Sequence, residues 1–299
     1  MMRSEVKKVL LSEIRICSKK KNCVMKKILL LILVFASSNL FSQTKIDSTK
    51  ADTVKWKKGG SASLNFSQVS LTNWSAGGEN SLSAIALVNL FANYKKDKNT
   101  WENTLDMGYG LLQSGRLPFR KSDDKMEFTT KRGYKTKSKW YYAFLLNFKS
   151  QFAPGYNYPN DSVITSDFLA PGYFLVSTGM DYKPNDGFSF FASPLTGKIT
   201  VVSRQSIANV GSFGVEKALF DSTGVVITNG RKLRYEFGAL ISIKFKKEIA
   251  KNVTISTKVD IFSNYVKNPQ NIDVNWDMLI GFKVNKYISA SITTTLIYD

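Results

Sequence analysis

The sequence contains no histidine, and its two cysteines, Cys17 and Cys23, both lie close to the N-terminus. Histidine is the most common general acid and base near neutral pH, and together with cysteine it supplies the usual ligands of zinc, copper and haem. Hydrolases with a serine–histidine pair, proteases with an aspartate–histidine pair and thiol chemistry are therefore excluded. We expect no enzyme, no catalytic residue, no metal and no cofactor; a carboxylate pair or a serine–lysine pair is the catalytic alternative left.

Long hydrophobic runs are missing as well. The run Ile28–Ala36 is too short to cross a bilayer core of about 30 Å as a helix. It follows the basic stretch Met25–Lys27 and precedes the small residues of Ser37–Ser42, which is the pattern of a cleaved secretory signal peptide. A signal peptide normally begins at the start codon, so we expect residues 1–24 to be a spurious or non-functional extension.

Positive charge is in excess, with a formal net charge of +19. Nine basic and two acidic residues fall in Met1–Ser42, so the exported remainder carries +12. A basic balance indicates anionic surroundings. For an exported protein we expect these to be outer-membrane lipid, lipopolysaccharide and a small polar solute, with the barrel-assembly machinery as a partner during insertion and no nucleic acid.

From Ser61 onward, amphipathic segments are joined by connections that alternate between short and long. The short connections are Lys95–Asn99, Lys135–Lys139, Lys183–Gly187, Lys246–Asn252 and Val284–Tyr287. The long ones are Leu71–Asn80, Ser114–Asp123, Ala153–Gly172, Arg204–Arg231 and Val266–Asn271. Bacterial outer-membrane barrels place short turns in the periplasm and long loops outside. The pattern predicts an all-β fold: a transmembrane, antiparallel, up-and-down β-barrel.

Side chains alternate strictly within the segments. The clearest cases are Trp140–Phe152, Leu233–Phe245 and Ile272–Val284, in which every second residue is apolar except Ser150 in the first. A soluble β-sandwich also alternates, but its strands are usually about five or six residues long. Segments of this length, with aromatic residues near both ends, favour strands that cross a bilayer.

Eleven such segments can be counted. They are Ser61–Ser70, Ser81–Tyr94, Thr100–Leu112, Asp124–Tyr134, Lys139–Phe152, Tyr173–Tyr182, Phe188–Val202, Lys232–Phe245, Val253–Tyr265, Ile272–Val284 and Tyr287–Tyr298. Single-chain bacterial barrels have an even number of strands. We therefore expect about twelve, with the last strand missing after Asp299. The predicted organisation is an extension (1–24), a signal peptide (25–42), a periplasmic segment (43–60) and a barrel (61–299).

Several stretches resemble an uncharacterised family of Bacteroidota outer-membrane proteins with a domain of unknown function. They are Asn73–Asn80, Arg120–Lys125, Gln151–Tyr156, Asp181–Asp186 and Pro269–Trp276. The resemblance runs from about Trp56 to Asp299, with an apparent insertion at Ala218–Gly230. It implies the location and the fold only, because the family has no established activity.

The alternation also assigns charged residues to the barrel interior. The lumen-lining candidates are Glu102, Asp106, Lys125, Glu127, Lys131, Lys149, Asp181, Arg234, Glu236, Lys244, Lys258, Asp260, Asp273, Asp277 and Lys283. Charges of both signs can select solutes in a narrow channel, or they can form ion pairs that close the barrel. We expect passage or binding of a small polar solute; the alternative is a closed structural barrel or a scaffold for an exported complex.

One outer loop carries a basic cluster. Arg116, Arg120 and Lys121 are candidates for contact with lipopolysaccharide phosphate, although a solvated loop explains them equally well. The sequence leaves open whether the loop at 204–231 plugs the lumen.

Overall fold

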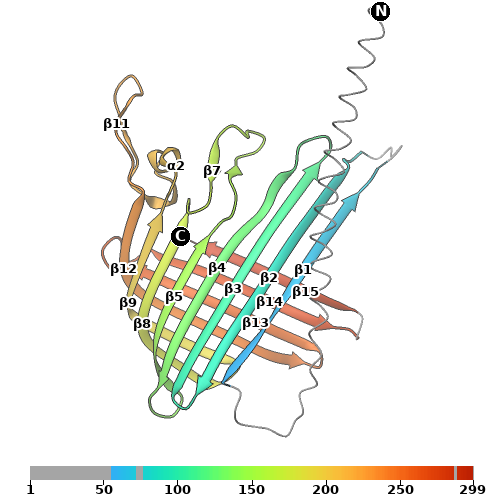
Figure 1. Ribbon diagram of the computed structural model, residues 1–299, viewed down its shortest axis with the longest axis vertical. Coiled ribbons are helices and arrows are strands. Elements are labelled where there is room, and N and C mark those ends of the chain that lie inside the picture. The colour runs from blue at the N-terminus through green and yellow to red at the C-terminus, as the bar shows by residue number, and fades with distance from the viewer. Residues whose placement is uncertain (1–54, 72–76, 286–287, 299) are drawn as a thin grey trace, which may run out of the picture. The chain divides into compact units, whose positions relative to one another are not determined.

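The computed structural model describes residues 55–71, 77–285 and 288–298, all of which belong to one compact unit, Lys55–Asp299. The predicted extension and signal peptide lie outside the described residues. Eleven antiparallel strands form one sheet in which neighbours in space follow each other along the chain (Figure 1). They are β1 (Trp56–Val69), β2 (Ser81–Lys96), β3 (Asn99–Ser114), β4 (Arg120–Lys135), β5 (Trp140–Ser150), β8 (Gly172–Asn185), β9 (Phe188–Val201), β12 (Leu233–Ala250), β13 (Val253–Asn264), β14 (Ile272–Lys283) and β15 (Ser289–Tyr298). The predicted all-β, up-and-down fold is confirmed.

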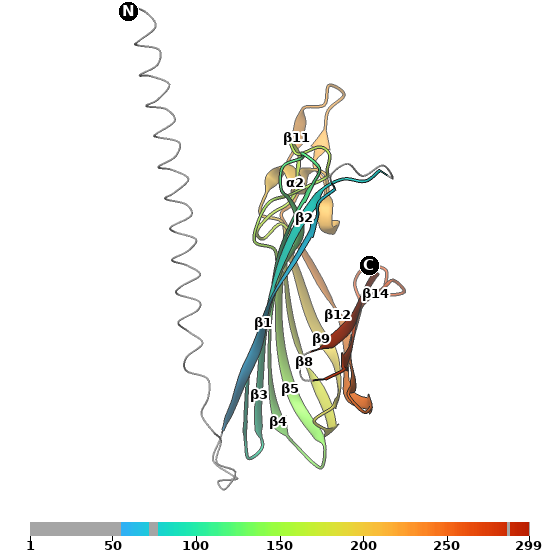
Figure 2. The ribbon, with the colours of Figure 1, turned by 90° about the vertical axis from the view of Figure 1, so that its right-hand side faces the viewer.

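The short connections gather at one end of the sheet, here called the turn end, and the long ones at the opposite loop end (Figures 1 and 2). Tight turns at the turn end use residues with positive φ, such as Asp97 (52°) and Asn252 (64°). Asn and Asp tolerate this left-handed conformation better than other side chains.

The long loops carry small elements of their own. Ala153–Gly172 contains the paired strands β6 (Gly155–Tyr156) and β7 (Ile164–Ser166). The next long loop contains the helix α2 (Gln205–Asn209), a 3-10 helix at Ser212–Gly214, and the paired strands β10 (Leu219–Phe220) and β11 (Val226–Thr228). In both views these elements stand beyond the loop end of the sheet (Figures 1 and 2).

Several strands are longer than the sequence pattern predicts. β1 begins at Trp56 rather than Ser61, β4 at Arg120 rather than Asp124, and β12 continues to Ala250. Backbone pairing does not require an apolar face, so ladders such as Trp56 with Tyr94 extend beyond the amphipathic segment. The predicted periplasmic segment therefore overlaps the first strand.

Within the described residues, the outermost strands β1 and β15 pair only with β2 and β14. The eleven expected strands are present, and a closing pair is not seen among these ladders. With eleven antiparallel strands in sequence order, β1 and β15 run in the same direction, so they cannot form an antiparallel pair with each other. A twelfth strand after Asp299 stays a prediction.

The two faces of the sheet differ in polarity. The sheet curls so that β13–β15 lie opposite β1–β4 (Figures 1 and 2), and its convex face is apolar. In β5, for example, Tyr142 and Phe144 are 63% and 48% exposed, whereas Tyr141 and Ala143 on the concave face are buried. No helix among the described residues is long and apolar enough to cross a membrane.

Aromatic side chains cluster on the convex face near the turn end. Trp56 packs against Tyr94 and Trp101 with ring centroids 5.2 and 5.6 Å apart, and Trp140 packs against Tyr182 at 4.9 Å. Tryptophan and tyrosine in such a band are typical of a barrel at the boundary between lipid and water.

Strand β9 contains a bulge. One extra residue near Pro194 shifts the register against both neighbouring strands. Near this level two glycines lie where the adjacent backbone leaves no room for a side chain: a Cβ at Gly238 on β12 would lie 1.9 Å from the carbonyl oxygen of Ser263 on β13, and one at Gly179 on β8 would lie 2.1 Å from that of Ala192 on β9. The two glycines are therefore required by close backbone packing.

We predict that Gly238→Ala destabilises the barrel by about 1–3 kcal/mol, because the added methyl group overlaps the backbone of β13. The matched control is Gly197→Ala, on the neighbouring strand β9, where an added Cβ meets no atom within 4 Å. Urea unfolding of the refolded full chain measures both. Equal midpoints for the two variants would contradict the packing argument.

Candidate functional site

The concave face carries three clusters of charged side chains. The turn-side cluster joins strands β3, β4 and β8. Lys131 Nζ lies 2.6 Å from Asp181 Oδ2, and Lys183 Nζ lies 3.2 Å from the same oxygen. Glu102 completes the cluster by pairing with Lys183 and by lying 3.8 Å from Lys131. Ser189 donates a hydrogen bond of 2.7 Å to Asp181, so this carboxylate, 1% exposed, is fully engaged.

The cross-wall cluster connects opposite sides of the curled sheet. Glu127 on β4 lies 3.5 Å from Lys258 on β13, although β5, β8, β9 and β12 separate these strands in the sheet. Lys258 also pairs with Asp260 at 2.9 Å, and Lys149 pairs with Glu127 at 3.6 Å. Because a contact between strands so far apart in the ladder is possible only across the interior, these side chains bridge the interior at this level.

The loop-side cluster joins β9, β12 and β14. Lys198 lies 2.8 Å from Asp273 and 3.6 Å from Glu236, whose other oxygen accepts from Arg234 at 2.8 Å. All three clusters are charge-assisted networks in which most lysines touch more than one acceptor, which restricts their side-chain freedom.

Apolar residues share the interior with these charges. Ala143, Leu145, Phe191, Leu240 and Phe262 form a buried cluster on the concave face. Lys131 lies over the Phe191 ring at 5.9 Å and Lys198 over the Phe262 ring at 5.2 Å, so cation–π contacts join the two kinds of residue. The part of the interior beneath β5, β9, β12 and β13 is therefore packed with side chains.

Every lumen candidate lies in a strand of the main sheet, and the structure brings ten of the fifteen into the three clusters. The ten are Glu102, Glu127, Lys131, Lys149, Asp181, Arg234, Glu236, Lys258, Asp260 and Asp273. The other five, Asp106, Lys125, Lys244, Asp277 and Lys283, have no ion pair within the described part of the chain. Asp106 instead accepts from Asn89, and Asp277 accepts from Thr295 at 2.9 Å. The role of all fifteen in passage stays a prediction.

Sequence reasoning missed two members of the clusters. Lys183 was expected in a short turn, but β8 extends to Asn185 and carries it into the interior. Lys198 lies beyond the bulge of β9, where the strict alternation is interrupted. The proline at position 194 is the sequence signal that could have indicated the bulge, since proline within a sheet favours such sites.

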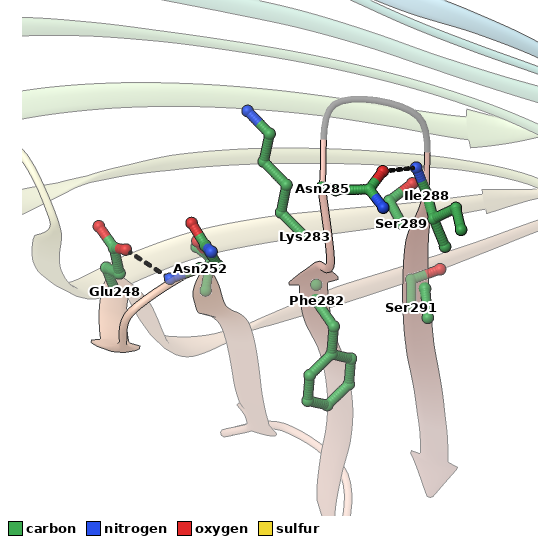
Figure 3. A pocket seen from close by; sticks show the side chains of 11 residues that line it. Glu248, Asn252, Phe282, Lys283, Asn285, Ile288, Ser289 and Ser291 are labelled. Carbon is green, nitrogen blue, oxygen red and sulfur yellow. Dashed lines mark hydrogen bonds between the residues drawn. The ribbon is translucent and has the colours of Figure 1, made fainter.

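Two pockets lie at the ends of the sheet rather than at the clusters. One is formed at the turn end by β12–β15, where Glu248 accepts from the backbone of Asn252 and Lys283 points away from Phe282 (Figure 3). The other lies at the loop end between β1, β2 and β3. Both are open and shallow, so neither competes with the interior as the candidate site. The described residues contain no group of three His, Cys, Asp or Glu side chains that could hold a metal.

The two longest loops fold together above the loop end. Ala170, Val202, Ile207, Ala208 and Val215 form a small buried core. The loop at 204–231 also touches the interior face, because Gly214 lies so close to Arg234 that an added Cβ would be 2.0 Å from the guanidinium. The loop therefore contacts the concave face at the loop end of β12.

A surface ion pair holds these loops to each other. Arg204 pairs with Asp167, and the backbone of Ser203 donates to Leu169 at 2.8 Å. Burial acts to raise the pKa of Asp167, but the hydrogen bonds from Arg204 and from the Phe168 amide outweigh it and hold the pKa below its usual range.

The basic residues proposed for lipopolysaccharide differ in their surroundings. Lys121 lies in β4, not in a loop, and its ammonium donates to Asp124, Gln151 and Ala153 at 2.8–3.0 Å. These three contacts use all three of its donors. Arg120 is stacked 4.7 Å from the Tyr158 ring, while Arg116 is exposed. Contact with lipopolysaccharide stays a prediction, now centred on Arg116.

Residues 66–156, less than a third of the chain, match the family model described as "Protein of unknown function (DUF3078)". No curated protein matches the chain. Among solved structures, an outer-membrane channel from Pseudomonas putida F1 is similar, with 10% identity, a TM-score of 0.38, and coverage of 86% of this chain and 92% of that one. The expected match to a family of unknown function is confirmed over residues 66–156; the Bacteroidota source is not tested.

We predict that Asp181→Asn lowers the free energy of unfolding by about 3–5 kcal/mol, because it leaves the buried Lys131 without its main partner. The control is Glu216→Gln, whose partner Arg231 is 72% exposed; such surface pairs contribute about 0–1 kcal/mol. Urea midpoints of the refolded barrel report both values. A loss of the same size in both variants would show that burial of the pair is not the cause.

We also predict that the joined loops open in acid. Because Asp167 has a lowered pKa in the folded protein, its stabilisation is present above the unfolded value of about 3.9 and is lost as the pH falls through the folded value. Hydrogen exchange of the amides at 164–170 should therefore accelerate below about pH 4. Asp167→Asn should give the same acceleration at pH 7, whereas Asp161→Asn, an exposed acid in the same loop, should not.

Proposed function

We propose that this chain is an outer-membrane β-barrel that passes a small polar solute along its charged interior. The observation that carries the proposal is the segregation of side chains by face. Charges of both signs occupy the concave face, whereas large apolar side chains such as Tyr142, Phe144 and Tyr235 project from the convex face. Exposed apolar surface on this scale requires a lipid or protein environment.

Strand length and the aromatic band support the membrane location. The strands contain 10–18 residues, and about 9–11 tilted residues cross a bilayer. The Trp56, Tyr94 and Trp101 group supports a lipid–water boundary at the turn end. Because short turns are periplasmic in outer-membrane barrels, the proposal puts the Lys-rich turns in the periplasm and the long loops outside.

The interior allows passage on one side only. The half beneath β4, β5, β8, β9 and β12 is filled by the ionic clusters and the apolar cluster. The concave residues of β1–β3, β14 and β15 are more exposed and include Asn89, Asp106 and Asp277. We place the solute route along these strands, where acidic side chains would govern ion selectivity.

A closed structural barrel is the second candidate. The specific observation in its favour is the cross-wall contact between Glu127 and Lys258, which brings opposite sides of the sheet together. In that case the interior charges stabilise the barrel and no solute passes through it.

Single-channel recording of the full chain in planar bilayers distinguishes the two candidates. We expect openings, and we expect the double variant Asp106→Asn, Asp277→Asn to shift the reversal potential in a salt gradient toward anion selectivity, since it removes two interior negative charges. Arg132→Gln, on the convex face of β4, is the control and should leave selectivity unchanged. A correctly folded barrel without openings would support the closed barrel.

A further inference from the structure

Among the described residues, Lys244 is a cation without a partner, although the lysines of the neighbouring clusters are paired. Five lysines of the concave face each lie within 4.0 Å of at least one carboxylate; they are Lys131, Lys149, Lys183, Lys198 and Lys258. Lys244 has no ion pair or hydrogen bond of its side chain to any described residue. Lys125 and Lys283 are also unpaired on this face, but they are exposed to water, whereas Lys244 is partly buried.

The neighbours of Lys244 leave no carboxylate for it. It lies on β12 directly opposite Ser189 of β9 and Lys258 of β13. Ser189 already donates to Asp181. The charges that act on Lys244 are Lys131 and Lys258, which repel it, and Glu102 and Asp260, which attract it.

Both attracting carboxylates are engaged elsewhere. Glu102 pairs with Lys183, and Asp260 pairs with Lys258 at 2.9 Å and accepts from Ser242 at 2.5 Å. Lys244 therefore lies between the turn-side and cross-wall clusters with its three donors unused. A buried ammonium without a counter-charge is unfavourable unless an anion compensates it.

We infer that Lys244 binds a small monovalent anion in the interior of the barrel. The anion takes the position that a carboxylate occupies beside each of the five paired lysines. The inference goes beyond the proposed function: the site lies under β12, outside the route along β1–β3, β14 and β15, and it does not require that the anion be carried.

Thermal unfolding of the refolded full chain tests the site without reference to conductance. Chloride replaces gluconate, an anion too bulky for a packed interior, at constant ionic strength. We expect the Tm of the unmodified protein to rise with chloride concentration, as binding to the folded state requires. Lys244→Met should abolish the rise, and in gluconate it should be at least as stable as the unmodified protein, because it removes an uncompensated charge.

Two further variants keep the test decisive. Lys244→Arg retains a cation and should retain the chloride response. Lys125→Met removes an exposed, unpaired lysine from the same face and should also retain it. An unmodified protein that is insensitive to chloride, or a response that survives in Lys244→Met, would overturn the inference.

Conductance separates this site from the proposed function. A barrel that shows the Lys244-dependent chloride response but no channel openings has the anion site and lacks the transport function. A barrel that conducts while its Tm is insensitive to chloride is a channel without this site.

Discussion

The structure depends on ion pairs between strands that are not neighbours in the sheet. Glu127 and Lys258 meet across the interior with four strands between them, and Lys198 meets Asp273 across two. Backbone ladders determine the order of the strands, but they leave the curvature of the sheet adjustable over a range. Contacts across the concave face restrict that curvature, because each pair must be held within a few ångströms.

The interior combines charged side chains with aromatic rings that lie directly against them. Buried ion pairs gain little net stability, because desolvation offsets most of the attraction. The rings of Phe191 and Phe262 lie under Lys131 and Lys198 and exclude water while still interacting with the cations. Removing one partner of such a pair lowers the stability of the fold by far more than the intact pair raises it. The pairs therefore favour one specific geometry of the sheet.

The loops are a second packed unit and not only connections. Val202 and Ile207 are buried in the small core above the sheet, and Arg204 fixes this loop to Asp167 in the other. The contact between Gly214 and Arg234 joins that unit to the loop-side cluster. The loop unit therefore touches the interior charges at the loop end of the sheet.

The sequence by itself determined the strands, their order and the face of most side chains, because period-two alternation and alternating connection lengths are local properties. It placed Glu127, Asp181 and Lys258 on the concave face. It could not say which of these meet, since partners such as Glu127 and Lys258 are distant in both chain and ladder. Only the tertiary structure decided that Lys183 joins the interior, that the ammonium of Lys121 is engaged by nearby acceptors, and that no described side chain accepts from Lys244, because the curl of the sheet sets those distances.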